Sequence, residues 1–334
     1  MNTQVARVAL AALVCALSAA EPAFAGDKIT LMVGGIEKQI YLPAKLTEQL
    51  GYFKEQGLDV ELLSQPAGVD AENELVAGAV QGVVGFYDHT IDLQAKGKLI
   101  ESVVQLSQAP GEVELVASRM ANVIKSPADF KGHTLGVTGL GSSTNFLTQY
   151  MAVTAGLKPG DISVLAVGAG NTFIAAMQQQ KIDAGMTTEP TISQMLKTGE
   201  AKVLIDLRTP ATTVAALGGP YPAASLYMER AWVEAHRAEV QKLANAFVKT
   251  LKFMASHSGE EIAAKMPADY VGKDPAMYAS ALAAGKSQFT ADGVMPANGP
   301  ETVLKVLSAF DRAVMGKKID LAKTYTTEFV SAAR

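Results

Sequence analysis

Residues 136–146, GVTGLGSSTNF, combine the residue types that bind an anion at the start of a helix. Gly141 lets the backbone turn tightly, and Ser142, Ser143 and Thr144 add hydroxyl donors. The first N–H groups of a helix have no partners within it and carry a partial positive charge, which suits a sulfonate, carboxylate or phosphate group. A serine that only caps the helix is the alternative interpretation.

A nucleotide-phosphate loop is a third interpretation of this stretch, and the sequence excludes it. The stretch lacks the Gly-Lys-Ser/Thr run of a P-loop. Thr144 also stands where the dinucleotide-binding pattern requires glycine. We therefore interpret 136–146 as a site for another anion.

A second group of polar residues, FYDHT at 86–90, follows an apolar strand. Tyr87 offers a ligand a flat face or a hydroxyl group. Asp88 either caps the next helix or binds an amino or hydroxyl group. His89 either donates to a ligand oxygen or lies at the helix start on the surface or between lobes.

Other loops at predicted strand ends supply further candidates. Lys38, Gln39 and Tyr41 follow the first strand, and Lys38 is the only cation in the six loops of this kind. It either neutralises an anionic ligand or is solvated. The remaining candidates are Gly68 in QPAGVD, Asn171, which caps a helix or binds, and Glu189, which holds a ligand amine or hydroxyl or pairs with a basic side chain.

Short apolar runs alternate with helix-length segments and position these residues. The predicted strands are 29–35, 60–65, 83–87, 102–107, 134–139, 162–168, 184–189, 202–207 and 223–230. This alternation predicts an α/β fold with mostly parallel sheets, in which ligands bind beyond the carboxyl ends of strands. Offsetting the chain by 102 residues lays 59–68 on 161–170 and 75–87 on 177–189, which indicates two α/β lobes of like construction.

The first 25 residues read as a secretory signal peptide, with Arg7, an apolar run at 8–20 and an Ala-x-Ala cleavage site ending at Ala25. Cys15, the only cysteine, lies in this segment, so the mature chain has no thiolate for catalysis or zinc. A net charge of -4 argues against nucleic acid as a partner. No paired-histidine metal motif and no Gly-x-Ser-x-Gly nucleophile motif occurs, and we expect no metal or cofactor.

Four separated motifs carry a family resemblance. GYFKEQGLDVELL (51–63), SPADFKGHTLGV (126–137), AGLKPGDISVL (155–165) and QQKIDAGMTTEP (179–190) resemble the periplasmic binding proteins of ABC importers for sulfonates, taurine, nitrate and thiamine-precursor pyrimidines. The resemblance implies the type II periplasmic binding fold, two lobes joined by a hinge of two crossings. Lobe one would comprise 27–116 and 224–334, lobe two 117–223, and 113–120 and 222–228 would form the hinge.

The resemblance also implies the function. Such a protein captures a small molecule between its lobes in the periplasm and delivers it to an ABC permease with an ATPase subunit. We expect a monomer that binds a small organic anion, a sulfonate or carboxylate that is aromatic if Tyr41, Phe86 and Tyr87 face it. A neutral or cationic pyrimidine is the alternative ligand. Pyrimidine synthases related to this family are enzymes, but they carry a cysteine-rich motif that the mature chain cannot supply, so we expect no enzyme.

Overall fold

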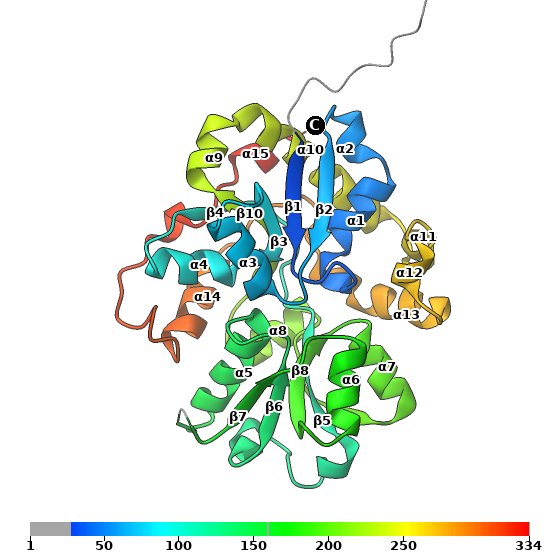
Figure 1. Cartoon of the computed structure of the whole chain (residues 1–334), viewed down its shortest axis with the longest axis vertical. Coiled ribbons are helices and arrows are strands. Elements are labelled where there is room, and N and C mark those ends of the chain that lie inside the picture. Colours follow the sequence, from blue (N-terminus) through cyan, green and yellow to red (C-terminus); the bar gives the residue numbers. More distant parts are fainter. Residues whose placement is uncertain (1–27, 159, 334) are drawn as a thin grey trace, which may run out of the picture.

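The computed structural model describes residues 28–158 and 160–333, and it forms two α/β lobes, one above the other in Figure 1. The predicted signal peptide lies outside the described residues. Each lobe contains one five-stranded sheet with helices against it.

The sheet of lobe one has the strand order β2-β1-β3-β10-β4. Apolar side chains fill both faces of its central strands, as expected for strands covered by helices on both sides. β1 pairs in parallel with β2 and β3, whereas β10 is antiparallel to β3 and β4. The bounds are Ile29–Val33 (β1), Val60–Ser64 (β2), Gly82–Phe86 (β3), Ile100–Gln105 (β4) and Ala224–Glu229 (β10).

The sheet of lobe two repeats this plan in the order β7-β6-β8-β5-β9. Its bounds are Glu112–Ala117 (β5), Thr134–Val137 (β6), Ser163–Ala166 (β7), Ala184–Thr188 (β8) and Ala201–Asp206 (β9). β2 and β7, and likewise β3 and β8, hold the same places in the two sheets. The correspondence that the 102-residue offset predicted is therefore confirmed.

The two antiparallel strands show where the chain crosses between lobes. β5 pairs with β8 and β9, so residues 113–116, which the sequence analysis placed in lobe one and in the hinge, lie in the sheet of lobe two. The crossings run through 106–111 and 207–223 and bond to each other: Gly111 N donates to Leu207 O, and Ala223 N donates to Ser107 O. We propose these two segments as the hinge.

Helices cover both sheets, and most of those that follow β10 surround lobe one (Figure 1). The long helix α10 (Arg237–Ser256) buries Val240, Leu243, Phe247 and Leu251, which form an apolar stripe at helical spacing. The helices before β10 are α1 Leu42–Gln49, α2 Tyr52–Glu55, α3 Gly68–Val76, α4 Asp88–Ala95, α5 Ser143–Thr154, α6 Asn171–Gln178, α7 Thr191–Thr198 and α8 Pro210–Leu217. Those after it are α9 Arg230–Ala235, α10 Arg237–Ser256, α11 Gly259–Ala263, α12 Ala268–Val271, α13 Pro275–Gly285, α14 Gly299–Ser308 and α15 Glu328–Ser331.

Within the described residues, no helix has both the length and the apolar character needed to cross a bilayer. The same part of the chain holds no group of three His, Cys, Asp or Glu side chains arranged to bind a metal ion.

Candidate functional site

A small cavity lies where the two lobes meet. Its lining comes from both of them: Lys38, Tyr41, Gly68 and Phe86 from lobe one, and Glu112, Thr138, Ser142, Ser143, Thr144 and Thr188 from lobe two. The volume is about 10 Å³, close to the space that one water molecule requires. An organic ligand would therefore need the lobes to part. Six predicted site residues are in this lining.

Lys38 is buried at the lobe-one wall of the cavity. Its Nζ donates to Gly34 O at 2.6 Å and to Pro66 O at 3.0 Å, which uses two of its three N–H donors. Burial lowers the pKa of Lys38 to about 8, although the carboxylates of Glu37 and Glu112 act in the opposite direction. The Lys38 side chain is thus fixed by two hydrogen bonds and has one N–H that can donate to a ligand. It is not the solvated lysine of the alternative interpretation.

The start of α5 forms the opposite wall. Ser142 precedes the helix without capping it through its side chain, so the capping interpretation is wrong, and its buried Oγ has no hydrogen-bond partner among the described residues. Thr144 Oγ1 accepts from Thr138 N at 3.0 Å. Ser143 Oγ donates to Asp88 Oδ1 at 2.8 Å, a bond between lobes.

Asp88 begins α4 and is fully buried between the lobes. It does not cap α4: its second oxygen accepts from Tyr221 OH at 2.9 Å, on one of the crossings. Burial raises the pKa of Asp88, and the nearby His89 and the bonds from Ser143 and Tyr221 oppose the rise. The acidic group that Ser143 binds at the start of α5 is thus the Asp88 carboxyl of the protein itself. Through its two oxygens, Asp88 connects lobe one to lobe two and to the crossing at 207–223.

The sequence analysis missed Glu112 and Thr188, which line the cavity from β5 and β8. They are directly opposite each other in the antiparallel ladder, so both side chains project from the same face of the sheet. Glu112 Oε2 and Thr188 Oγ1 are buried without a hydrogen-bond partner among residues 28–158 and 160–333. Burial, with Asp88 nearby, raises the pKa of Glu112 well above its ordinary value, against the opposing effect of Lys38.

A sequence signal for Glu112 did exist. In EVELVA, two glutamates alternate with apolar residues inside an apolar run, which places both carboxyls on one face of a buried strand. The other carboxyl, Glu114, lies outside the cavity lining and accepts from Thr148 Oγ1 at 2.9 Å. Burial raises the pKa of Glu114 to about 8.

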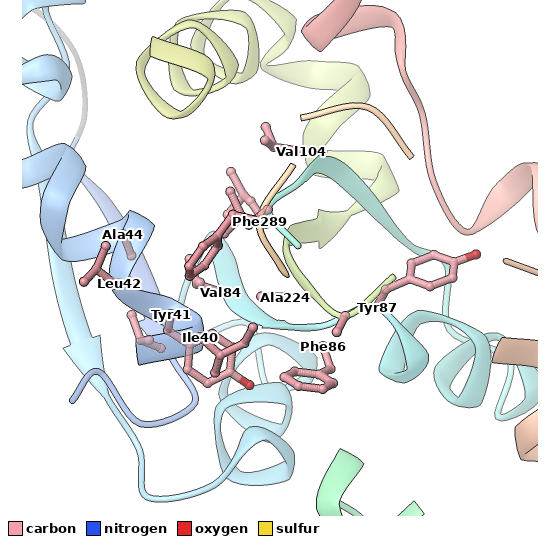
Figure 2. Packing of buried hydrophobic residues seen from close by; sticks show 14 of the residues in the cluster. Ile40, Tyr41, Leu42, Ala44, Val84, Phe86, Tyr87, Val104, Ala224 and Phe289 are labelled. Atoms are coloured by element: carbon pink, nitrogen blue, oxygen red, sulfur yellow. The ribbon is translucent and has the colours of Figure 1, made fainter. Parts of the chain in front are cut away.

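Two aromatic side chains of lobe one, Tyr41 and Phe86, line the cavity. Their rings pack edge to face with centroids 6.0 Å apart (Figure 2). Tyr87, predicted to face the ligand, points the other way, and its hydroxyl bonds to Thr324 Oγ1 in the C-terminal segment. The placement of Tyr87 is therefore corrected: it lies in lobe one, away from the cavity.

Two predicted residues connect the lobes beside the cavity. Gln39 N donates to Glu189 O at 3.0 Å, and the side chain of Gln39 bonds to Tyr278 O. The buried Glu189 carboxylate accepts from Arg208 Nη1 at 3.0 Å, so it has the basic partner that one interpretation gave it.

The other predicted residues are not part of the lining. His89 Nδ1 is 2.5 Å from Glu72 Oε2 inside lobe one; burial lowers the pKa of His89, but the Glu72 charge outweighs this and raises it to about 9. Gly141 has φ +88° and borders an outer groove with Val69. Asn171 is exposed at the start of α6, which follows the edge strand β7. Its predicted place in the site is therefore corrected, because it lies outside the cavity lining.

Comparison with known proteins agrees with this architecture. A protein from Bordetella bronchiseptica RB50 is 35% identical, with a TM-score of 0.88 over 91% of this chain and 96% of its own. The alkanesulfonate-binding protein SsuA from Xanthomonas axonopodis pv. citri, solved with MOPS, is 18% identical with a TM-score of 0.67, over 92% of this chain and 100% of its own.

A curated relative is the 4-amino-5-hydroxymethyl-2-methylpyrimidine phosphate synthase THI11 of Saccharomyces cerevisiae. It is 30% identical over 167 residues, 49% of this chain and 46% of the yeast protein, so the chain spans about half the length of the curated relatives it matches. The model of the family described as NMT1/THI5 like matches residues 41–261. The chain therefore belongs to the NMT1/THI5-like family, and it has the two-lobe fold of the periplasmic binding proteins of ABC importers.

Proposed function

We propose that this protein is the extracytoplasmic solute-binding protein of an ABC importer, and that its two lobes close over one small polar molecule. The observation that carries the proposal is the cavity, because its walls come from both lobes. A ligand that contacts both walls binds the closed form more tightly than the open form, and this difference in affinity shifts the population towards closure. A permease with its ATPase would then recognise the closed protein.

Two ligand classes have specific support. The remaining N–H of Lys38 and the hydroxyl of Ser142 favour a small organic acid, a sulfonate or a carboxylate. The aromatic pair Tyr41 and Phe86 and the pyrimidine named in the yeast relative favour an aminopyrimidine. The sulfonate-binding neighbours share only the fold with this chain, so the ligand class rests on the cavity.

We propose binding and not catalysis. The relatives named as synthases leave the question of an enzyme to experiment. Among the described residues that line the cavity there is neither a cysteine nor a histidine, so the lining offers no thiolate nucleophile and no imidazole base.

Native mass spectrometry of the mature protein tests the proposal, followed by titration calorimetry and solution scattering with the compound found and with a panel of organic acids and aminopyrimidines. We expect one bound molecule per chain, a smaller radius of gyration with ligand, and an unaltered compound after incubation. If none of the compounds tested reduces the radius of gyration, the binding function is contradicted. If the protein modifies a compound during incubation, it is an enzyme.

A further inference from the structure

The cavity contains a carboxyl group that the binding of an anion alone does not explain. Glu112 is 2% exposed and its Oε2 has no partner among the described residues. Thr188 Oγ1, opposite in the ladder, is equally buried and without a partner there. A buried polar atom without a hydrogen bond costs free energy, so these two oxygens together form a place for a ligand that donates.

The lobe-one wall has the opposite character. Lys38 keeps one N–H after bonding to Gly34 O and Pro66 O. Ser142 Oγ, across the lobe boundary, is the third oxygen of the lining that has no partner among residues 28–158 and 160–333. The cavity therefore has an accepting side on β5 and β8 and a donating side at Lys38 and the start of α5.

We propose that Glu112 determines specificity by accepting a hydrogen bond from an N–H group of the ligand, so that the ligand carries an amino group as well as an acidic or accepting group. The inference rests on the proposed binding function and narrows its ligand class to amino-bearing compounds. An anion without a donor group would leave Glu112 without a partner and would place a second negative charge beside a carboxyl.

The electrostatics of the lining agree with this assignment. The pKa of Glu112 is raised and that of Lys38 is lowered, because burial disfavours both charges. A ligand with a donor at one end and an acceptor at the other supplies each group with the partner that stabilises its charged form.

The position of Glu112 also connects the ligand to the hinge. Glu112 is the first residue of β5, directly after the crossing at 106–111, and its backbone oxygen accepts from Leu207 N on the other crossing. A ligand held by this side chain therefore contacts lobe two at the point where it joins the hinge.

Calorimetry with matched probes tests the inference. The pairs are 2-aminoethanesulfonate against ethanesulfonate, and 4-amino-5-hydroxymethyl-2-methylpyrimidine against its 4-hydroxy counterpart. We expect the amino member of at least one pair to bind at least tenfold more tightly. Glu112→Gln should reduce that preference to threefold or less, because a neutral amide oxygen accepts more weakly than a carboxylate and cannot balance the charge of an ammonium group. Glu114→Gln, on the same strand but outside the cavity, should keep the preference.

The outcomes separate the two proposals. If amino-free acids bind and compact the protein as well as their amino counterparts, or if Glu112→Gln keeps the preference, the role of Glu112 is overturned and the binding function stands. If no probe binds, the amino-ligand class is overturned as well, whereas the binding function fails only when no compound of the wider panel compacts the protein.

Discussion

Two glutamates on one face of β5 differ in their surroundings. Glu112 lines the cavity, and its Oε2 has no hydrogen-bond partner in the part of the chain that the structure describes, whereas Glu114 accepts a hydrogen bond from Thr148 in α5. Burial raises the pKa of both. The raised pKa of Glu112 affects how the cavity binds a ligand, and the raised pKa of Glu114 affects the stability of lobe two.

Glu114 makes the free energy of unfolding depend on pH. Its pKa is about 8 in the folded protein and near 4.5 in the unfolded chain. Between these values the folded carboxyl keeps its proton while the unfolded one loses it, so stability falls as pH rises, by roughly 1 kcal/mol per pH unit. Denaturant titrations from pH 5 to pH 8 should show a smaller fall for Glu114→Gln than for the wild type.

The exposed Glu301 provides the control, since its glutamine variant should follow the wild-type pH dependence. Parallel curves for wild type and Glu114→Gln would show that the Glu114 carboxyl titrates as in the unfolded chain, and would contradict this account.

Individual site residues were predictable where the loop alone decides their position. Lys38 and Ser142 to Thr144 followed from chemistry at strand ends, and they line the cavity. Tyr87 did not, because the direction of a side chain at a strand end depends on the pleat: Phe86 faces Tyr41, so its neighbour faces away. Glu112 was missed because its strand was interpreted as a hinge crossing.

At the scale of elements, the start of α3 and the loop before α5 contact each other across the lobe boundary. A Cβ added to Gly139 would lie 2.8 Å from Ala67 Cβ and 2.9 Å from Ser142 Oγ. Glycine at 139 therefore permits the closest approach of the lobes at this point.

We expect Gly139→Ala to disfavour the closed form and to weaken ligand binding about tenfold, because the lobes must separate by several tenths of an ångström. Adding Ala67→Gly removes the opposing methyl group and should restore part of the affinity. Gly285→Ala in α13, where the nearest atom belongs to the flexible Gln288 side chain, is the control. Calorimetry measures all three, and an unchanged affinity for Gly139→Ala would show that this contact does not limit closure.

The elements themselves were largely predictable, since all nine predicted strands are present with ends shifted by a few residues. The apolar runs of the central strands β1, β3, β8 and β10 are buried almost throughout, which makes them recognisable in the sequence. The sequence analysis missed the strand β5 because it interpreted most of that segment as a hinge crossing, and the pairing with β8 and β9 corrects this interpretation.

At the scale of the whole molecule, the proposed function requires the lobes to move about the proposed hinge at 106–111 and 207–223. Cys15 is the only cysteine of the sequence, so residues 28–334 offer a background without thiols. The Ala67 and Gly139 positions are close enough for a disulfide if the lobes part by roughly 1 Å, because bonded cysteines have Cβ atoms about 3.8 Å apart.

The variant with Ala67→Cys and Gly139→Cys should be compact when oxidised, and its radius of gyration should not change when ligand is added. Reduction should restore ligand-dependent compaction, as measured by solution scattering. The single Ala67→Cys variant is the control for the cysteine itself. If the oxidised double variant still changes its dimensions with ligand, the lobes do not move about the two crossings.

The return of the chain to lobe one has a consequence for biogenesis. β10, a strand inside the first sheet, begins at residue 224, after all of lobe two. A growing or translocating chain therefore cannot complete the sheet of lobe one until about two thirds of the 334 residues have emerged. We expect nascent chains that stop before 224 to be degraded by proteases throughout 28–105, and protection of that region to begin only once the chain includes residues 224–229.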